Sequence, residues 1–262
     1  MNAASADALL KGVGILVTRP PEQARGLMDA LHQRGANPLL FPALAILPPR
    51  HPEALAQALE HLDRFHLAIF ISPTAAQKGM AAVKASGTWP PGLAMAAVGK
   101  GTAKALAELG MTDVLTPPSG ADSEHLLALP QLRDMAGRSV ILFRGEGGRE
   151  ALADTLADRG AQVTHAVCYR RGLPPDADAG PVLAAFAAGR IQAVTAYSGE
   201  TLDNLFQLLG PEGESFLRRT PLFVPHPRIA AHAAALGVKT LITAPDGEGQ
   251  LLASLVEYFS HG

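Results

Sequence analysis

The chain alternates short apolar runs with longer amphipathic stretches. The apolar runs, which are typical of buried strands, are GILVTR, LAIFIS, LAMAAVG, SVILFR, QAVTAYS and PLFVP. Between them, apolar residues recur at helical spacing, as in Ala24, Leu27, Met28 and Leu31. Glycines follow several helical stretches, where C-terminal caps belong: Gly35, Gly110, Gly160 and Gly237. This alternation predicts an α/β fold built from doubly wound parallel sheets.

The chain also repeats itself at long range. VTRPPEQARGLMDALHQRGA (17–36) aligns without a gap with LFRGEGGREALADTLADRGA (142–161), and Arg19 falls on Arg144. Further matches keep a shift of 125 to 127 positions: Ser72 with Ser198, Gly110 with Gly237, and Thr116 with Thr243. A period this long indicates a duplicated α/β unit and not a short-repeat solenoid.

Two segments that end in prolines interrupt the alternation. LLFPALAILPPRHP (39–52) and VTHAVCYRRGLPP (163–175) hold equivalent places in the two copies, so we predict that they connect two domains. The pattern leaves open whether each copy forms its own domain or the copies exchange units. Residues 1–12 lack the pattern of a signal peptide, and we expect them to form a frayed leader.

Composition narrows the class of protein. A chain of 262 residues with 48% hydrophobic and 18% charged residues suits a soluble protein of two domains. A formal net charge of −2 offers no basic field for nucleic acid. The single cysteine, Cys168, excludes an internal disulfide and fits a reducing cytosol. His61 and His66 lack the spacing of a helical metal-ligand pair, and no apolar run is long enough for a membrane span.

The turns after the predicted strands carry the candidate chemistry, because ligands of parallel sheets bind at the carboxyl ends of the strands. Basic side chains at helix starts oppose the helix dipole, which makes more sense if an anion binds there. The residues singled out at these turns are Arg19, Ser72, Thr74, Gly99, Lys100, Thr102, Arg144, Gly145, Arg149, Ser198, Gly199, His226 and Arg228. Two plainer interpretations stay open: the basic residues are solvated surface charges, and Ser72 and Ser198 are only N-caps.

Three better-known motifs fail at these turns. GKGTAKA (99–105) has Lys104 where a dinucleotide fingerprint needs its third glycine. RGEGGRE (144–150) lacks the Lys-Ser or Lys-Thr of a P-loop, and YSGET (197–201) lacks the G-x-S-x-G of a nucleophile elbow. The turns therefore favour an anion other than a nucleotide phosphate.

In the second connector, the candidate functional residue is Tyr169, which stands beside Arg170 and Arg171. It either packs on a hinge or extends its hydroxyl into a cleft between domains. Cys168 is expected to pack, because no histidine stands beside it in a catalytic arrangement.

Together these motifs resemble the uroporphyrinogen-III synthase family over residues 13 to 259. The matching positions are VTRP with Gln23, Ser72 to Ala75, Ala97 to Ala103, Arg144 to Arg149, Tyr169 with Arg170, Ser198 with Gly199, and Arg228 to Ala230. The chain departs from the family at Pro225 to Arg228, where some members have Gly-Pro-Thr-Thr. Hydroxyl contacts of those members therefore do not transfer.

The resemblance implies two similar doubly wound parallel-sheet domains, joined by a two-stranded β connector and separated by a cleft. The first domain then comprises about residues 1–41 plus 172–262, and the second about 47–166. The connectors are about 42–46 and 167–171.

The resemblance also implies an activity. The substrate is hydroxymethylbilane, a linear tetrapyrrole with eight carboxylates, which is cyclised to uroporphyrinogen III with inversion of ring D and loss of water. No cofactor or metal is needed, Tyr169 is the candidate acid catalyst, and the turn residues bind carboxylates. We expect a cytoplasmic monomer, supplied by hydroxymethylbilane synthase, without nucleic acid or membrane contact. The alternative is a non-catalytic binding or regulatory protein of the same fold.

Overall fold

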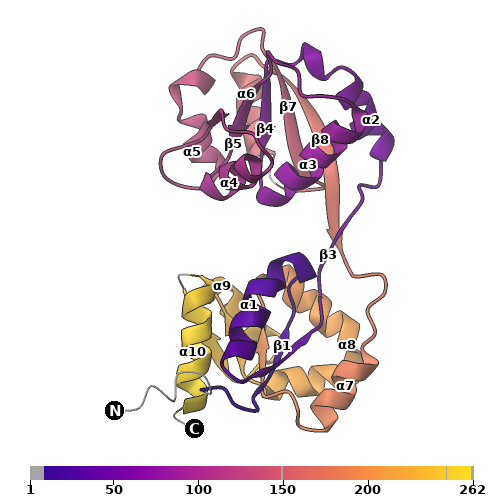
Figure 1. Cartoon of the computed structure of the whole chain (residues 1–262), viewed down its shortest axis with the longest axis vertical. Coiled ribbons are helices and arrows are strands. Elements are labelled where there is room, and N and C mark those ends of the chain that lie inside the picture. Colours follow the sequence, from indigo (N-terminus) through magenta and orange to yellow (C-terminus); the bar gives the residue numbers. More distant parts are fainter. Residues whose placement is uncertain (1–8, 149, 246, 261–262) are drawn as a thin grey trace. The chain divides into compact units, whose positions relative to one another are not determined.

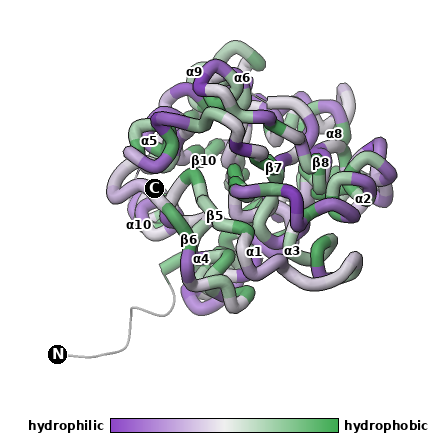
Figure 2. The backbone as a smooth tube through the Cα atoms, turned by 90° about the horizontal axis from the view of Figure 1, so that it is seen from above, coloured by the Kyte–Doolittle hydropathy of each residue, from purple (hydrophilic) through white to green (hydrophobic). Residues whose placement is uncertain are grey.

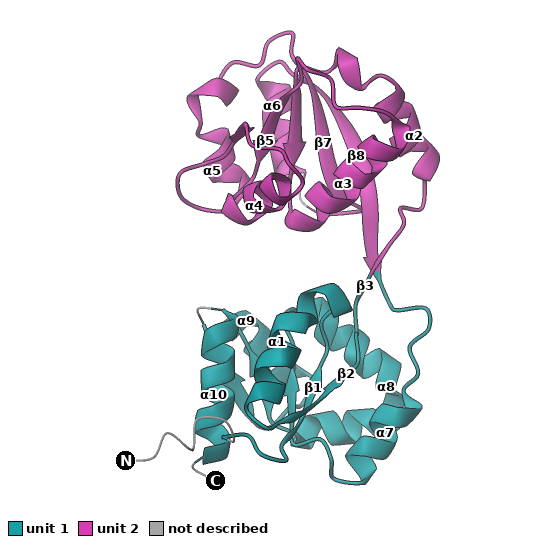
Figure 3. Ribbon diagram, in the orientation of Figure 1, with its two compact units in different colours: residues 1–45, 172–262 teal, residues 46–171 magenta. Residues whose placement is uncertain are grey.

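The structure, a computed structural model, describes residues 9–148, 150–245 and 247–260 (Figure 1). The chain divides into two compact units, coloured separately in Figure 3. Unit 1 comprises residues 1–45 and 172–262, and unit 2 comprises residues 46–171. Both units are α/β and contain parallel sheets, as the alternating pattern predicts.

Unit 1 is built on a five-stranded sheet with the order β11-β10-β9-β1-β2. Its strands are β1 (Gly14–Val17), β2 (Asn37–Leu40), β9 (Ala193–Thr195), β10 (Leu222–Val224) and β11 (Leu241–Thr243). Its helices are α1 (Pro21–Gln33), α7 (Gly180–Ala187), α8 (Gly199–Arg219), α9 (Pro227–Ala235) and α10 (Glu248–Ser260). Helix α8 is kinked at Gly210, which has φ of 62°, followed by Pro211.

The two faces of this sheet follow from strand alternation. Ile15 and Val17 point into a core that α1 and α10 cover, while Leu16 points into a core that α7, α8 and α9 cover. All four residues of β1 are buried, as expected for a central parallel strand with helices on both faces.

The expectation of a frayed leader over residues 1–12 is wrong for its last part. Residues 1–8 lie outside the described residues, but Leu10 is fully buried in the core beneath α1 and α10. The Leu10 N–H donates to the carbonyl oxygen of Arg34 at 3.0 Å, and the Gly12 N–H donates to that of Gly35. The buried Leu10 side chain and these two backbone hydrogen bonds hold the segment in place.

Unit 2 carries the sheet order β3-β8-β7-β4-β5-β6. Its strands are β3 (Ala45–Leu47), β4 (Leu67–Phe70), β5 (Ala94–Ala97), β6 (Val114–Leu115), β7 (Ser139–Gly145) and β8 (Gln162–Gly172). Its helices are α2 (Pro52–Glu60), α3 (Pro73–Ser86), α4 (Lys100–Glu108), α5 (Ser123–Leu127) and α6 (Ala151–Asp158). Short 3₁₀ turns lie at Leu62–Arg64 and Pro130–Leu132.

This sheet is also buried on both faces. Ala68 and Phe70 of β4 face α2, α3 and α4, whereas Leu67 and Ile69 face α5 and α6. Phe70 stacks on Phe143 of β7 with ring centroids 4.5 Å apart. Figure 2 shows the resulting hydrophobic stretches, in green, at the strands β6 and β7.

The two sheets share one strand order. The sequence repeat pairs β11, β10, β9, β1 and β2 with β6, β5, β4, β7 and β8, and these sets lie in the same order in their sheets. Each unit therefore contains strands from both copies of the repeat, so the copies have exchanged units. All four predicted cap glycines have positive φ, between 78° and 90°. Among the described residues, no helix is long and apolar enough to cross a membrane.

Candidate functional site

The carboxyl ends of the strands carry the predicted residues in both units. In unit 2, Ser72 follows β4 and Gly99 follows β5, whereas Arg144 and Tyr169 lie within the last residues of β7 and β8. Thr74, Lys100 and Thr102 lie in the first turns of α3 and α4. Arg149 lies outside the described residues.

Tyr169 owes its position to an irregularity in the sheet. Arg144 of β7 pairs with Val167, but the next residue, Gly145, pairs with Tyr169, so Cys168 is an extra residue in β8. Such a bulge turns consecutive side chains toward one face. Cys168 and Tyr169 accordingly lie in the same core cluster, beneath α3.

The Tyr169 hydroxyl reaches the beginning of α3. It lies 3.2 Å from Ser72 Oγ, which also accepts the N–H of Ala75 at 3.0 Å. Ser72 is thus an N-cap, as one of the open interpretations holds, and at the same time the partner of the connector tyrosine. Tyr169 is only 4% exposed, whereas Ser72 is half-buried.

Gly145 is the residue that makes room for this tyrosine. A Cβ at position 145 would lie 2.7 Å from Cζ and 3.1 Å from the hydroxyl oxygen of Tyr169. No ordinary side chain tolerates such a distance. The glycine of the RG motif therefore serves ring packing, in addition to any N–H that it offers to a ligand.

Arg144 is buried and fully engaged inside unit 2. Its side chain is 4% exposed, and Nη1 donates to both carboxylate oxygens of Glu150 at 2.9 and 2.8 Å. Its Nη2 donates to the carbonyl oxygen of Gly147 at 2.5 Å, and His165 Nδ1 lies 3.1 Å from Nη1. These donors hold the glycine-rich turn in shape. Arg144 hence binds this turn directly, and a ligand carboxylate would have to replace Glu150.

The beginning of α4 has no side-chain cap. Gly99 occupies the N-cap position and offers no side-chain cap, while Ala121 of a following loop packs within 2.9 Å of where its Cβ would lie. Lys100 is exposed at this turn, and Thr102 is buried on the inner face of α4. Backbone N–H groups at an uncapped helix start, with a lysine beside them, suit a carboxylate.

In unit 1 the corresponding turns are capped differently. Ser198 Oγ accepts the N–H of Thr201 at 3.0 Å, and Thr201 Oγ1 lies 2.8 Å from it. His226 Nδ1 accepts the N–H of Arg228 at 3.1 Å, so a neutral His226 ring carries its proton on Nε2. The His226 Nε2–H and the exposed Arg228 side chain are the donors that this turn offers.

Two residues of unit 1 that the sequence patterns did not single out lie at the SGET turn. His232 of α9 packs over Gly199, with Cδ2 3.4 Å from where a Cβ would stand, and its Nε2 lies 2.6 Å from Asp203 Oδ1 of α8. His232 stands among alanines in the sequence, and Asp203 belongs to no motif singled out above. Only the packing of α8 against α9 brings them together.

Arg19 resembles Arg144 in having a carboxylate partner. Its Nη1 lies 2.9 Å from Glu248 Oε2 of α10, and its guanidinium carbon lies 4.2 Å from the centre of the Tyr197 ring. Unlike Arg144, the Arg19 side chain is 24% exposed. It is the more accessible of the two repeat-related arginines.

Cys168 packs, as predicted. Its thiol donates to the carbonyl oxygens of Arg144 and Ala75, and burial raises the pKa of the thiol to about 12. A thiol with this pKa stays protonated near neutral pH and is a poor nucleophile.

The fold and these turns define a two-unit α/β protein whose strand ends present hydroxyls, N–H groups and basic side chains. The family model described as uroporphyrinogen-III synthase HemD matches residues 26–251. Uroporphyrinogen-III synthase of Salmonella typhimurium is 31% identical over 243 residues, which cover 92% of this chain and 98% of that protein. The Escherichia coli K12 enzyme matches with the same identity and coverage. The chain belongs to the uroporphyrinogen-III synthase family.

Solved structures agree on the fold. Uroporphyrinogen III synthase from Thermus thermophilus, in a mutant form, superposes with a TM-score of 0.61 at 21% identity and covers 95% of this chain and 100% of that chain. The Helicobacter pylori protein gives 0.56 at 14% identity and covers 94% and 99%. The resemblance inferred from the turn motifs is confirmed, and so is its enzyme class, a cyclising hydro-lyase of heme biosynthesis.

Proposed function

We propose that this chain cyclises hydroxymethylbilane to uroporphyrinogen III and that the hydroxyl pair of Tyr169 and Ser72 supplies the proton that the departing hydroxyl needs. Family membership supports the reaction. The observation that carries the roles of the two residues is the 3.2 Å contact between their hydroxyl oxygens.

The hydrogen bonds of this pair leave one proton for a ligand. Two O–H groups meet, and only one of them donates within the pair. Because Tyr169 is buried and Ser72 is half-buried, the arrangement that suits the site has Tyr169 donating to Ser72 and Ser72 donating outward. Ser72 then passes its proton to the ligand and recovers one from Tyr169.

The proposed step balances without a cofactor. The C–O bond of the hydroxymethyl group breaks as the pyrrole nitrogen donates its electron pair, and the leaving oxygen takes the proton of the pair and departs as water. A protonated azafulvene remains, which the substituted carbon of ring D attacks, and a spiro intermediate then opens and recloses with ring D inverted. The proton lost when the last ring regains aromaticity restores the hydroxyl pair.

Positioning supplies the rest of the rate and selects the isomer. Closure without inversion gives isomer I, so the protein must hold the linear chain in one geometry. Carboxylates of the substrate bind the turns at Gly99 with Lys100, at Ser198 with Gly199, and at His226 with Arg228. These turns offer N–H groups and cations, which explains how a chain of net charge −2 takes a polyanion.

The proposal also covers the compartment, the oligomeric state and the source of the substrate. The chain acts as a cytoplasmic monomer that receives hydroxymethylbilane from hydroxymethylbilane synthase. A single cysteine, buried and unreactive, suits a reducing compartment.

The test is a double-mutant cycle. Tyr169→Phe, Ser72→Ala and the double variant are incubated with hydroxymethylbilane, the products are oxidised, and isomers I and III are separated. We expect Tyr169→Phe to lower kcat by roughly 10- to 100-fold while isomer III persists. The double variant should lose little more than Ser72→Ala alone, because the two hydroxyls act as one unit.

Ser198→Ala is the matched control. It removes the equivalent N-cap in unit 1, at a cost of about 1 kcal/mol of stability, as Ser72→Ala does in unit 2. Only Ser72→Ala should lower kcat; Ser198→Ala should act on KM. Full turnover by Tyr169→Phe would remove the tyrosine from the chemistry, and only isomer I from the wild-type chain would favour the non-catalytic alternative.

A further inference from the structure

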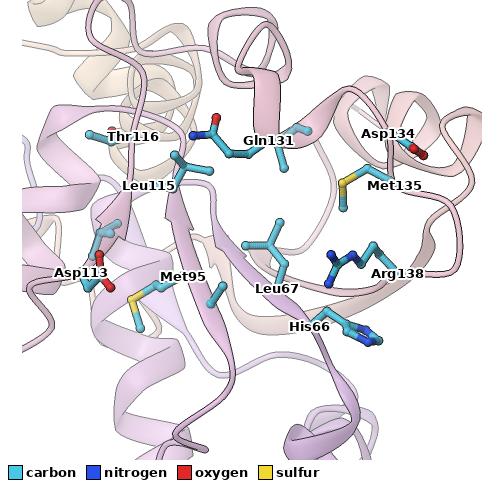
Figure 4. A pocket seen from close by; sticks show the side chains of 13 residues that line it. His66, Leu67, Met95, Asp113, Leu115, Thr116, Gln131, Asp134, Met135 and Arg138 are labelled. Atoms are coloured by element: carbon cyan, nitrogen blue, oxygen red, sulfur yellow. The ribbon is translucent and has the colours of Figure 1, made fainter.

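Unit 2 contains a pocket at the amino ends of its strands, away from the turns described above. Its volume is about 620 Å³, within the range typical of small-molecule sites. Leu67 opens β4, Ala94 opens β5 and Arg138 directly precedes β7 (Figure 4). The floor is apolar and is formed by Leu67, Met95, Leu115, Leu132 and Met135.

The pocket exists because α5 is short. Helix α5 ends at Leu127, and Pro130 begins a 3₁₀ turn that leads the chain away from the sheet. In unit 1 the corresponding helix, α10, continues for 13 residues and packs Leu255 and Phe259 onto the same face. The face that α10 covers in unit 1 is therefore partly open beside β5 and β6 in unit 2.

A cation without a partner lies at one end of this pocket. No carboxylate in the described part of the chain pairs with Arg138, whose side chain extends toward Leu67 in Figure 4. Its backbone is fixed, since its N–H donates to Met135 and its carbonyl accepts from Gln162. Asp134 is directed away and accepts the N–H of Ala136, and Asp113 lies at the far end.

His66 lies near Arg138 and adds a second donor. The backbone N–H of Ser139 donates to His66 Nδ1 at 3.1 Å, so a neutral ring carries its proton on Nε2. Arg138 and His66 thus give the same end of the pocket two donor side chains beside an apolar floor.

We propose that this pocket is a second ligand site, which binds a small organic anion through Arg138 and packs the apolar body of that anion on Leu67, Leu132 and Met135. A single anionic head fits, because one guanidinium serves it. The site is independent of the proposed chemistry at Tyr169, since it lies at the opposite ends of the strands.

Two dyes of similar shape test the proposal on the full chain. 8-Anilinonaphthalene-1-sulfonate combines an aromatic body with one anionic group, and N-phenyl-1-naphthylamine has the same body without charge. We expect the sulfonate dye to bind the wild-type chain with enhanced fluorescence. Arg138→Gln should raise its Kd by about 5- to 10-fold and leave the Kd of the neutral dye unchanged.

Two further variants locate the binding. Ala94→Phe fills the pocket from the start of β5 and should abolish the fluorescence of both dyes. Arg133→Gln removes an exposed arginine of the same loop that does not line the pocket, and it should change neither Kd. Synthase activity and the thermal unfolding curve of each variant report whether the fold is intact.

The opposite results overturn the assignment. Equal sulfonate binding by the wild type, Arg138→Gln and Ala94→Phe would place the dye elsewhere. Loss with Ala94→Phe but no change with Arg138→Gln would show that the pocket does not recognise the anion. An equal effect of Arg133→Gln would reduce the role of Arg138 to general surface charge.

Discussion

The two units have the same strand order but differ in the environment of their repeat-related arginines. Arg19 follows β1 and Arg144 lies near the end of β7, the repeat-related strand, and each pairs with a glutamate at the start of a helix. In unit 1 the pair is partly exposed and rests on the Tyr197 ring. In unit 2 the arginine is buried and ties Glu150 to the carbonyl of Gly147.

The two arginines therefore serve different purposes, one holding a turn in shape and the other offering a cation to a ligand. The burial of Arg144 fixes the turn next to Gly145 and Tyr169, where we propose that a proton is transferred. The exposure of Arg19 leaves a cation that a carboxylate of a ligand can reach by displacing Glu248. Of the two repeat-related turns, one has its arginine buried and the other has it accessible.

The largest expected effect tests the rigid turn. Gly145→Ala places a methyl group 2.7 Å from the Tyr169 ring, so the ring must shift from the position in which its hydroxyl contacts Ser72. A displacement of about 1 Å at a catalytic group costs on the order of 100-fold in rate. We expect a fall in kcat of that size, measured as uroporphyrinogen III formed from hydroxymethylbilane.

Gly92→Ala is its control in the same unit. No atom lies within 4 Å of where its Cβ would stand, and its φ lies outside the left-handed region. This variant should retain wild-type activity. If Gly145→Ala also retained it, the packing of Tyr169 against Gly145 would be irrelevant to turnover.

The second prediction compares the two glutamates. Glu150→Ala leaves the buried Arg144 without its bidentate partner and should lower the free energy of unfolding by about 2 kcal/mol. Glu248→Ala should cost under about 1 kcal/mol, because the Arg19 pair is open to solvent. Urea unfolding measures both values, and hydrogen exchange at Gly147 and Gly148 locates the first effect.

Glu248→Ala should also lower KM, since it frees Arg19 for a substrate carboxylate. Equal losses of stability in the two variants would contradict the comparison. A KM that rises with Glu248→Ala would show that Glu248 does more than occupy Arg19.

How much of this the sequence predicts depends on the range of the interactions. Strands, helices, capping glycines and the repeat are local or periodic, and the apolar patterns predicted them. The N-caps at Ser72 and Ser198 are local too, and both are present. The units exchanged by the two copies, which the pattern left open, depend on strand order and hence on long-range pairing.

The sequence predicted which candidate residues lie at the strand ends but not which residues their side chains contact. The turn motifs place Arg144 and Tyr169 at neighbouring strand ends, yet nothing in RGEGGRE indicates that Arg144 is buried on Glu150. The contact between Tyr169 and Ser72 depends on the extra residue at Cys168, a one-residue shift that no periodicity reveals. His232 and Asp203 escaped notice because only the packing of α8 against α9 brings them together.

The third prediction concerns pH and sharpens the contrast at Glu150. The hydrogen bond from Arg144, assisted by the charges of Arg144 and His165, lowers the pKa of the Glu150 carboxyl below its value of 4.5 in an unfolded chain. A carboxyl with a lowered pKa stabilises the fold above that value, and the stabilisation is lost as the pH falls through the folded pKa.

The wild type and Glu150→Gln should therefore differ in urea midpoint at pH 6 and converge as the pH falls through the lowered pKa of Glu150 in the folded chain. The corresponding difference in the free energy of unfolding at pH 6 is expected to be about 1 kcal/mol or less, because half of the glutamate side chain is exposed. Curves that stay parallel down to pH 3 would mean that the charge of Glu150 contributes nothing.

The smallest expected effect is a gain in unit 1. The Tyr197 hydroxyl is buried, and within the described part of the chain it has no hydrogen-bond partner, whereas the Tyr169 hydroxyl has Ser72. Burial raises the pKa of Tyr197, so the group stays neutral and carries only the cost of its lost hydration. Tyr197→Phe keeps the ring beneath Arg19 and should raise the free energy of unfolding by roughly 0.5 to 1 kcal/mol, with activity retained.

Thermal unfolding measures the change, and Tyr169→Phe, which breaks a hydrogen bond, should show no such gain. Destabilisation by Tyr197→Phe would mean that the Tyr197 hydroxyl has a hydrogen-bond partner, as the Tyr169 hydroxyl has.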